Sequence, residues 1–219
     1  MGTHSNLRTA IVGASRQLFR SDVMSHSGHA NLSARVDEGS FLITATGMVR
    51  ELDASQLAHV GFEGEVLEGE LGDENAEIVA MHSAVYARRQ DVGAVIHTHS
   101  PSATAFALAN QPLPCRHEPL LRFGQAETIP VIPWGPRGSG VSVNGIESAL
   151  DHHPGTNAVL LANHGLLVFG TDPAGAAGLV VAVEESADAE LSATALGGAQ
   201  DLPAGALEDI RESMGKART

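Results

Sequence analysis

The chain has 219 residues and a formal net charge of −13. This charge excludes a general affinity for nucleic acid or for an anionic membrane surface, because both carry charge of the same sign. Hydrophobic residues make up 43% of the chain and charged residues 18%, a balance typical of a globular protein rather than a disordered one. The single cysteine, Cys115, excludes an internal disulfide and any zinc site built from several cysteines.

No uninterrupted apolar segment reaches the roughly 18 residues that a membrane span needs. The first six residues also lack the apolar core of a signal peptide. We therefore expect a soluble, cytoplasmic protein. No internal repeat, low-complexity segment or long linker interrupts the chain, so we expect residues 1–219 to form a single domain.

In the first part of the chain, apolar residues at helical spacing predict helices, and alternating or β-branched apolar runs predict strands. The predicted elements are a helix at 6–24, a loop at 25–31, strands at 32–36 and 41–46, and a hairpin at 57–67. Asn75 follows, and we expect it to be an N-cap. Ile78, Met81, His82 and Val85 then lie at the spacing of an amphipathic helix.

The second part of the chain begins with a buried strand that leads into His97. The elements predicted after it are helices at 101–108, 141–150, 173–196 and 203–214 and strands at 129–132, 158–162 and 166–169. Strands and helices are thus interspersed. This order predicts an α/β fold, with a mixed sheet that is covered by helices on both faces.

His97 and His99 stand at the end of the apolar run 92–96. Side chains two positions apart on a strand point to the same face, so the two imidazoles project together. His164 follows the predicted strand at 158–162, and it completes a three-imidazole set if that strand lies next to the His97 strand. Three protein ligands with an open position are the pattern of a catalytic metal site. Such a nitrogen-rich site favours zinc, with iron, cobalt or manganese as alternatives.

These histidines also have an explanation that involves no metal. A histidine at a strand end is commonly a hydrogen-bonded core or surface residue, and a His-x-His pair alone is a weak signal. Eleven histidines also give the chain many chances to place two of them close together. Residue spacing alone leaves both interpretations open.

Glu77 lies in the first turn of the helix that precedes the histidine strand. A carboxylate beside a metal can act as a general base or as a proton donor. The helix macrodipole also favours acidic residues at this position without any catalytic role. Two turns, 28–31 and Thr46-Gly47, offer backbone N–H groups to an anion, although glycine and asparagine are common in ordinary turns.

Taken together, these motifs resemble the class II aldolase/adducin family over most of residues 6–196. The resemblance rests on NLSAR at 31–35, LITATG at 42–47, EIVAMHSAVY at 77–86, DVGAVIHTH at 91–99 and LLANHG at 160–165. It implies a three-layer α/β fold with a central, mostly antiparallel sheet. It also implies a homotetramer with active sites at the subunit interfaces.

The resemblance further implies roles for individual residues. His97, His99 and His164 match the metal ligands, and Glu77 matches the acid/base, with Glu74 as the alternative. Asn31, Thr46 and Gly47 match positions that hold a substrate phosphate. The metal would act as a Lewis acid that stabilises an enediolate while a carbon–carbon bond breaks or forms.

This sequence departs from the sugar-phosphate aldolases beside Glu77. Asn75 and Ala76 occupy the positions of a phosphate-binding serine pair, and Asp73 and Glu74 precede them. Additional negative charge next to a phosphate dianion is unfavourable, so the phosphorylated state of the substrate stays open. His117, Glu118 and Arg122 lie in a segment that could reach the site, and Arg122 could bind a carboxylate or lie in solvent.

We therefore expect a metal-dependent lyase that carries out aldol or retro-aldol cleavage of a small hydroxy-keto compound, a sugar or sugar phosphate. A decarboxylase or an epimerase on the same metal site is the alternative. A metal-free, adducin-like scaffold is the alternative from another class, and a metal oxygenase on the same ligands is a further one.

Overall fold

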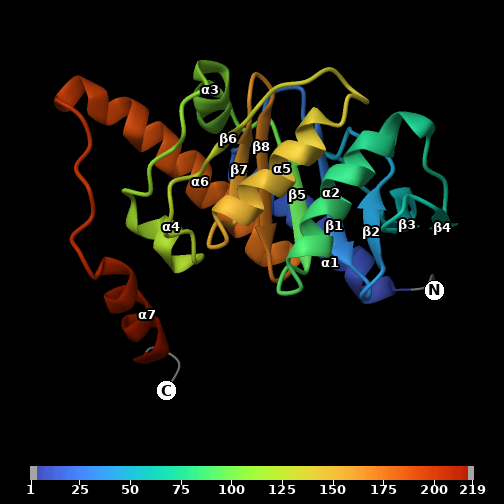
Figure 1. The fold of residues 1–219 in the computed structure, drawn as a ribbon. Helices are drawn as coiled ribbons and strands as arrows, with labels where there is room; N and C mark the ends of the chain where they lie inside the picture. The colour runs from blue at the N-terminus through green and yellow to red at the C-terminus, as the bar shows by residue number, and fades with distance from the viewer. Residues whose placement is uncertain (1–3, 217–219) are drawn as a thin grey trace.

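An eight-stranded sheet with the order β4-β3-β2-β1-β5-β8-β7-β6 forms the centre of the computed structural model, which describes residues 4–216 (Figure 1). All neighbouring strands are antiparallel except β6 and β7, which are parallel. The strands are β1 (Ala30–Arg35), β2 (Ser40–Thr44), β3 (Leu57–Gly61), β4 (Val66–Glu68), β5 (Ala94–Thr98), β6 (Val131–Ile132), β7 (Ala158–Leu161) and β8 (Gly165–Gly170). This topology confirms the predicted mixed, mostly antiparallel sheet.

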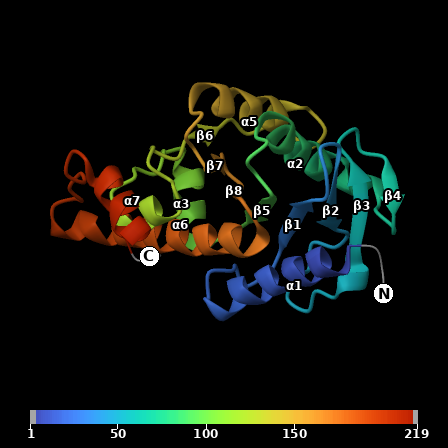
Figure 2. The same cartoon turned by 90° about the horizontal axis from the view of Figure 1, so that it is seen from below.

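Helices cover both faces of the sheet, as the sequence predicts, and Figure 2 shows the resulting three layers. The helices of one layer are α1 (Ser5–Arg20), α3 (Pro101–Ala109) and α6 (Pro173–Ala193), and those of the other are α2 (Ala76–Arg88) and α5 (Val141–His152). Alternation along the strands supplies a separate apolar core to each layer. Ile96 of β5 packs in the core on the α6 side, whereas its neighbour Val95 packs in the core on the α2 side.

The remaining elements are short or peripheral. They are α4 (Glu118–Arg122), α7 (Ala206–Lys216) and the 3₁₀ turns Ala54–Gln56, Asp73–Asn75 and Thr194–Leu196. Helix α4 has only five residues and was not predicted, because one turn carries too little periodicity to identify. Helix α7 contacts α4 and lies away from the sheet (Figure 1). Within residues 4–216, no helix is long and apolar enough to cross a membrane.

The start of α2 differs from the prediction. Asn75 occupies the expected position, but its side chain makes no cap hydrogen bond to the helix. Its Nδ2 instead donates to the carbonyl of Gly72, at 3.2 Å, and the 3₁₀ turn Asp73–Asn75 leads directly into Ala76. The N–H groups of the first turn of α2 are therefore not capped by Asn75.

Five strand termini meet at one end of the sheet. The pairs Asn31↔His97 and Thr98↔Leu166 bring the start of β1 to the end of β5 and the start of β8. The β7–β8 turn and the end of β6 lie at the same end, since Leu161 pairs with Gly165 and with Ile132. The antiparallel register thus gathers residues that are far apart in the sequence.

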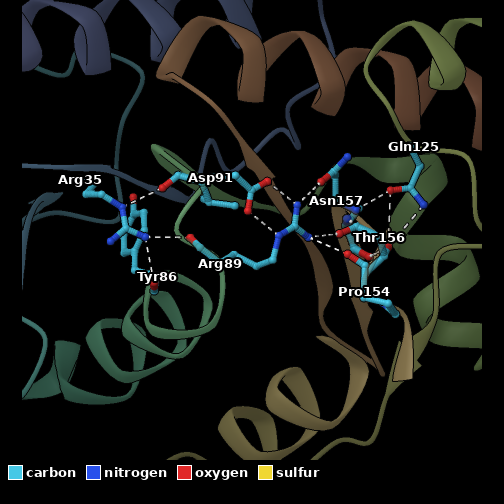
Figure 3. A network of polar contacts seen from close by, with 10 residues as sticks. Arg35, Tyr86, Arg89, Asp91, Gln125, Pro154, Thr156 and Asn157 are labelled. Atoms are coloured by element: carbon cyan, nitrogen blue, oxygen red, sulfur yellow. Dashed lines mark hydrogen bonds and ion pairs between the residues drawn. The ribbon is translucent and has the colours of Figure 1, made fainter. Parts of the chain in front are cut away.

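Arg89 fixes the opposite end of the sheet (Figure 3). Its guanidinium donates to both carboxylate oxygens of Asp91, at 2.8 and 2.7 Å, and to the carbonyl of Thr156 at 2.8 Å. Its Nη2 also donates to Oδ1 of Asn157, at 3.0 Å. These contacts join the segment before β5 to the segment before β7, so both strands enter the sheet from fixed positions.

Candidate metal and substrate site

A cavity of about 590 Å³ lies at the sheet end where the five strand termini meet. Its walls come from the start of β1, the turn after β2, the start of α2, the β7–β8 turn and the segment after β6. The seven residues to which the family resemblance assigns a first role in the site all line this cavity: Asn31, Thr46, Gly47, Glu77, His97, His99 and His164.

The three histidines converge on one point. Nε2 of His97 lies 3.1 Å from Nε2 of His99, and one ring nitrogen of each of the three lies within 4.8 Å of the others. Ring centroids are 4.6 Å apart for His97 and His164 and 5.0 Å apart for His99 and His164. Two nitrogens bound to one tetrahedral zinc ion at about 2.0–2.1 Å are separated by about 3.3 Å. The spacing of the rings therefore fits a shared ion.

His97 is held in the tautomer that a metal ligand requires. A backbone carbonyl can only accept, so Nδ1–H of His97 donates to the carbonyl of Leu166, at 2.9 Å. Burial lowers the pKa of His97 well below its ordinary value, and His164 and His99 lower this pKa further. The ring is therefore neutral near pH 7, and the lone pair of Nε2 points toward the other two rings.

His99 and His164 are also kept neutral. Burial is the first cause that lowers the pKa of each, and His164 also lowers the pKa of His99. The positive charge of Arg137 lowers the pKa of His164, while the negative charge of Glu77 opposes that effect. Arg137 and Glu77 thus lie close enough to His164 to affect it electrostatically.

The turn that carries His164 depends on close backbone approach. Asn163 has a φ of +57°, and Gly165 follows His164 at the start of β8. A Cβ atom on Gly165 would lie 2.5 Å from the carbonyl oxygen of Thr98 and 2.9 Å from Cδ2 of His99. Glycine at this position lets the turn approach β5 closely enough for the three imidazoles to meet.

One carboxylate oxygen of Glu77 accepts a hydrogen bond, and the other has no partner among the described residues. Its Oε2 accepts from the N–H of Gly138, at 3.0 Å. Its Oε1 is buried and has no hydrogen-bond partner among the described residues. An unpaired buried oxygen is costly, so this atom calls for a cation or a proton donor. Together with the three imidazoles, it fits a bound metal or a substrate hydroxyl.

Glu74, the alternative acid/base, also lines the cavity. Its side chain is solvent-exposed and its carboxylate lies against Gly72. The backbone carbonyl of Glu74 accepts from Nη1 of Arg137, at 3.1 Å. Glu74 contacts Arg137 through its backbone and its carboxylate is exposed, whereas Oε1 of Glu77 is buried. Glu77 is therefore the better placed candidate for the acid/base.

Asn31 is oriented by a buried chain of hydrogen bonds that the sequence did not reveal. Nε2 of His82 lies 2.7 Å from Oδ1 of Asn31, and Nδ1 of His82 lies 2.6 Å from Oγ of Ser33. Ser33 Oγ is in turn 2.8 Å from the hydroxyl of Tyr86. An Nε2–H of His82 that donates to Oδ1 leaves the Asn31 amide N–H₂ for the cavity. His82 lies on the predicted apolar face of α2, where a core role is the ordinary expectation.

Thr46 and Gly47 form the cavity wall after β2. Oγ1 of Thr46 accepts from the N–H of Met48, at 3.2 Å, and the carbonyl of Gly47 accepts from the N–H of Ala30, at 3.0 Å. The second contact ties this turn to the start of β1 and keeps it beside Asn31. His29, which belongs to the predicted turn 28–31, also lines the cavity, as do Trp134 and Arg137, which belong to no motif that the sequence identified.

The segment around Arg122 does not line this cavity in the single subunit, so of the two alternatives for Arg122 the structure shows the solvent-exposed one. Arg122 pairs with Glu118 at the i,i+4 spacing within α4, and both side chains are exposed. Nδ1 of His117 lies 3.0 Å from Oγ of Ser186 on α6. Helix α4 packs against α6, which holds the segment away from the histidine cavity.

Comparison with known proteins finds one family and several close folds. The profile of the Class II Aldolase and Adducin N-terminal domain matches residues 9–191. The 5-methylthioribulose-1-phosphate/5-deoxyribulose-1-phosphate aldolase of Rhodospirillum rubrum is 29% identical, over 97% of this chain and 93% of that protein. The 3-oxo-tetronate 4-phosphate decarboxylase of Haemophilus influenzae is 31% identical, over 73% of this chain and 75% of that protein.

Solved structures of similar proteins share the fold of this chain. An L-fuculose 1-phosphate aldolase superposes with a TM-score of 0.82 and 27% identity, over 97% of this chain and 98% of that one. YgbL from Klebsiella pneumoniae superposes with a TM-score of 0.80 and 27% identity, over 96% of this chain and 100% of that one.

Gly165→Ala tests the close approach at the β7–β8 turn. We expect the variant to fold but to bind zinc at least about tenfold more weakly, because the added methyl group displaces the turn from His97 and His99. Zinc affinity is measured by competition with a chromophoric chelator. Gly13→Ala, in α1, is the matched control, since its added Cβ meets open space and its backbone is helical. Unchanged zinc affinity in Gly165→Ala would contradict this geometry.

Burial of His82 predicts a pH dependence of folding stability in the metal-free protein. Burial lowers the pKa of His82 to about 3 in the folded state, against 6.5 for an ordinary histidine. Between these values the unfolded chain binds a proton that the folded chain does not, so the free energy of unfolding decreases as the pH falls. His82 alone contributes a decrease of about 2 kcal/mol between pH 8 and pH 5.

Urea denaturation in the presence of a chelator measures this dependence. His82→Gln cannot titrate, so its stability should change less between pH 8 and pH 5 than that of the wild type. An identical pH dependence of the two proteins would show that His82 does not stay neutral in the folded state.

Proposed function

The chain belongs to the Class II Aldolase and Adducin N-terminal domain family, and we propose that it is a metal-dependent lyase that cleaves or forms a carbon–carbon bond in a small hydroxy-keto substrate. The relatives named above are aldolases and a decarboxylase, which agrees with an enzyme of the class II aldolase type. We further propose that zinc is the metal and that residues 1–219 act as a single cytoplasmic domain.

The observation that carries this proposal is the convergence of three neutral imidazoles beside an unpaired carboxylate oxygen. His97, His99 and His164 would hold the ion, and Glu77 Oε1 lies in the same cavity without a partner among residues 4–216. A metal ion held there would supply Lewis-acid polarisation of a carbonyl or hydroxyl oxygen. A metal-free scaffold would have no need for a three-histidine cluster of this kind.

Glu77 is proposed as the group that moves the proton. In the cleavage direction, the hydroxyl group whose carbon becomes the aldehyde must lose its proton, and the other fragment must gain one. Oε2 of Glu77 is fixed by Gly138, which leaves Oε1 to take or to give that proton.

Asn31, Thr46 and Gly47 are proposed to hold the substrate at the β1–β2 side of the cavity. The amide N–H₂ of Asn31 and the backbone of the turn after β2 supply donors for a phosphate or another oxygen-rich group. The named relatives act on phosphorylated substrates. A phosphorylated substrate is therefore the form that we propose for this chain.

Decarboxylation is the second candidate reaction. The decarboxylase from Haemophilus influenzae is as similar to this chain as the aldolases are. Both reactions break a bond to the carbon next to a carbonyl group, so the same three histidines could serve either one. Metal-loaded protein incubated with hydroxy-keto and keto acids in D₂O, and followed by NMR, distinguishes aldehyde release from loss of CO₂, and epimerisation appears as deuterium exchange.

We also propose a homotetramer with active sites at the subunit interfaces. Support comes from large apolar side chains that are exposed in the single chain, such as Leu196, which is 89% exposed, and Trp134, which is 61% exposed. Trp134 lines the cavity, so a neighbouring subunit that covers it would also enclose the site.

Glu77→Gln tests the proton-transfer role. The variant keeps the size and one oxygen of the side chain, so we expect unchanged metal content and at least a 10²-fold loss of turnover. Glu74→Gln is the matched control, because it removes an acid from the same cavity wall, and we expect it to retain most of the turnover. The opposite pattern would move the acid/base role to Glu74.

A further inference from the structure

A network of four buried polar side chains ends at the cavity, and only its last member, Asn31, has a role in the proposed reaction. The other three, Tyr86, Ser33 and His82, are at most 1% exposed and do not line the cavity. A buried donor without an acceptor is costly, so each hydrogen of such a network needs a partner. The direction in which the network donates therefore follows from the group at its far end.

Tyr86 is that far end. Burial raises the pKa of Tyr86 above its ordinary value, so the phenol keeps its proton, and Oγ of Ser33 lies 2.8 Å away to accept it. The backbone of Val95 lowers this pKa, which is the effect of a donating N–H, so it does not take the proton. The hydrogen of Ser33 then points to Nδ1 of His82, at 2.6 Å, rather than to the carbonyl of Val95, at 3.5 Å.

His82 passes this direction on to the cavity. Burial lowers the pKa of His82 to about 3, so its ring is neutral near pH 7 and carries one N–H. Because Nδ1 accepts from Ser33, that hydrogen lies on Nε2 and is donated to Oδ1 of Asn31, at 2.7 Å. The amide then turns its N–H₂ group toward the cavity, where Nδ2 of Asn31 has no hydrogen-bond partner among residues 4–216.

The opposite direction would give the cavity the opposite chemistry. Asn31 would donate to Nε2 of His82, and the cavity would face the amide oxygen, which accepts from a hydroxyl or an ammonium group. The hydrogen of Ser33 would then point to Tyr86, and the phenol hydrogen would be left without an acceptor. The cost of that unpaired buried donor favours the first direction.

We propose that the three buried residues behind Asn31 are positioning residues, which present its N–H₂ group rather than its oxygen to the substrate and thereby select an oxyanion at the β1 side of the cavity. This inference rests on the proposed function. It gives substrate selection to a tyrosine and a serine that act only through Asn31.

The tautomer of His82 in the zinc-loaded wild type tests the direction of donation. In protein labelled with ¹⁵N-histidine, NMR distinguishes a ring nitrogen that carries hydrogen from one that does not, and His82→Gln identifies the signals by their loss. We expect the hydrogen on Nε2. A hydrogen on Nδ1 would overturn the proposal.

Binding of glycerol 3-phosphate to the zinc-loaded protein, measured by calorimetry, tests the action through Asn31. Ser33→Ala separates Tyr86 from His82 and lets the amide turn, so we expect binding to weaken about two- to tenfold, the effect of one hydrogen bond. The same substitution in an Asn31→Ala background should have no effect. Ser83→Ala is the matched control, since it removes a buried hydroxyl of α2 that has no hydrogen-bond partner among the described residues.

Three binding results would contradict the proposal. One is a wild type that does not bind glycerol 3-phosphate, and another is an unchanged affinity in Ser33→Ala. The third is an equal loss in the two backgrounds, which would show a purely structural role for Ser33. A protein with the expected tautomer and the expected coupling, but without turnover, would refute the lyase and leave this proposal standing.

Discussion

The hydrogen bond from His97 Nδ1 to the carbonyl of Leu166 links the fold to the chemistry of this protein. It exists because β5 and β8 are antiparallel neighbours in a register that places Thr98 opposite Leu166. The same register brings the β7–β8 turn, and with it His164, back to the end of β5. A shift of one residue would turn the imidazole of His97 to the other face of the sheet.

Electrostatics at the site follow from burial rather than from net charge. The chain is strongly acidic, yet the three imidazoles are neutral because burial lowers the pKa of each of them. Repulsion from other histidines lowers the pKa of His97 and His99 further, and repulsion from Arg137 does so for His164. Neutral imidazoles are the form that binds a metal. Glu77 adds a negative charge and Arg137 a positive charge, and the two segments that carry them hold each other in place. The carboxylate of Glu77 accepts from the N–H of Gly138, and the guanidinium of Arg137 donates to the carbonyl of Glu74.

Strand periodicity predicted that two of the histidines lie together, but residue spacing alone left a metal site and an ordinary core role both open. The period of two predicted that His97 and His99 project together, and the apolar runs located β5, which ends beside them, and β7, which precedes His164. The position of His164 depended on β7 and β8 lying beside β5, which the resemblance to the family supplied. The match to that family is confirmed, as is the mixed sheet.

The residues that sequence reasoning missed are those defined by tertiary contacts. Arg137 follows a strand of only two residues, and its place at the cavity depends on the parallel pairing of β6 with β7. His82 looks like an apolar-face residue of α2, because only its spatial neighbours Asn31 and Ser33 reveal a polar role. Arg122 has a guanidinium that could bind a carboxylate, but it pairs with Glu118 within α4 and does not line the cavity.

X-ray absorption spectroscopy at the zinc edge of the zinc-loaded protein tests the central claim most directly. The account predicts one zinc ion per chain with three imidazole nitrogens, and a spectrum with fewer than three, or with a sulfur ligand from Cys115, would contradict it.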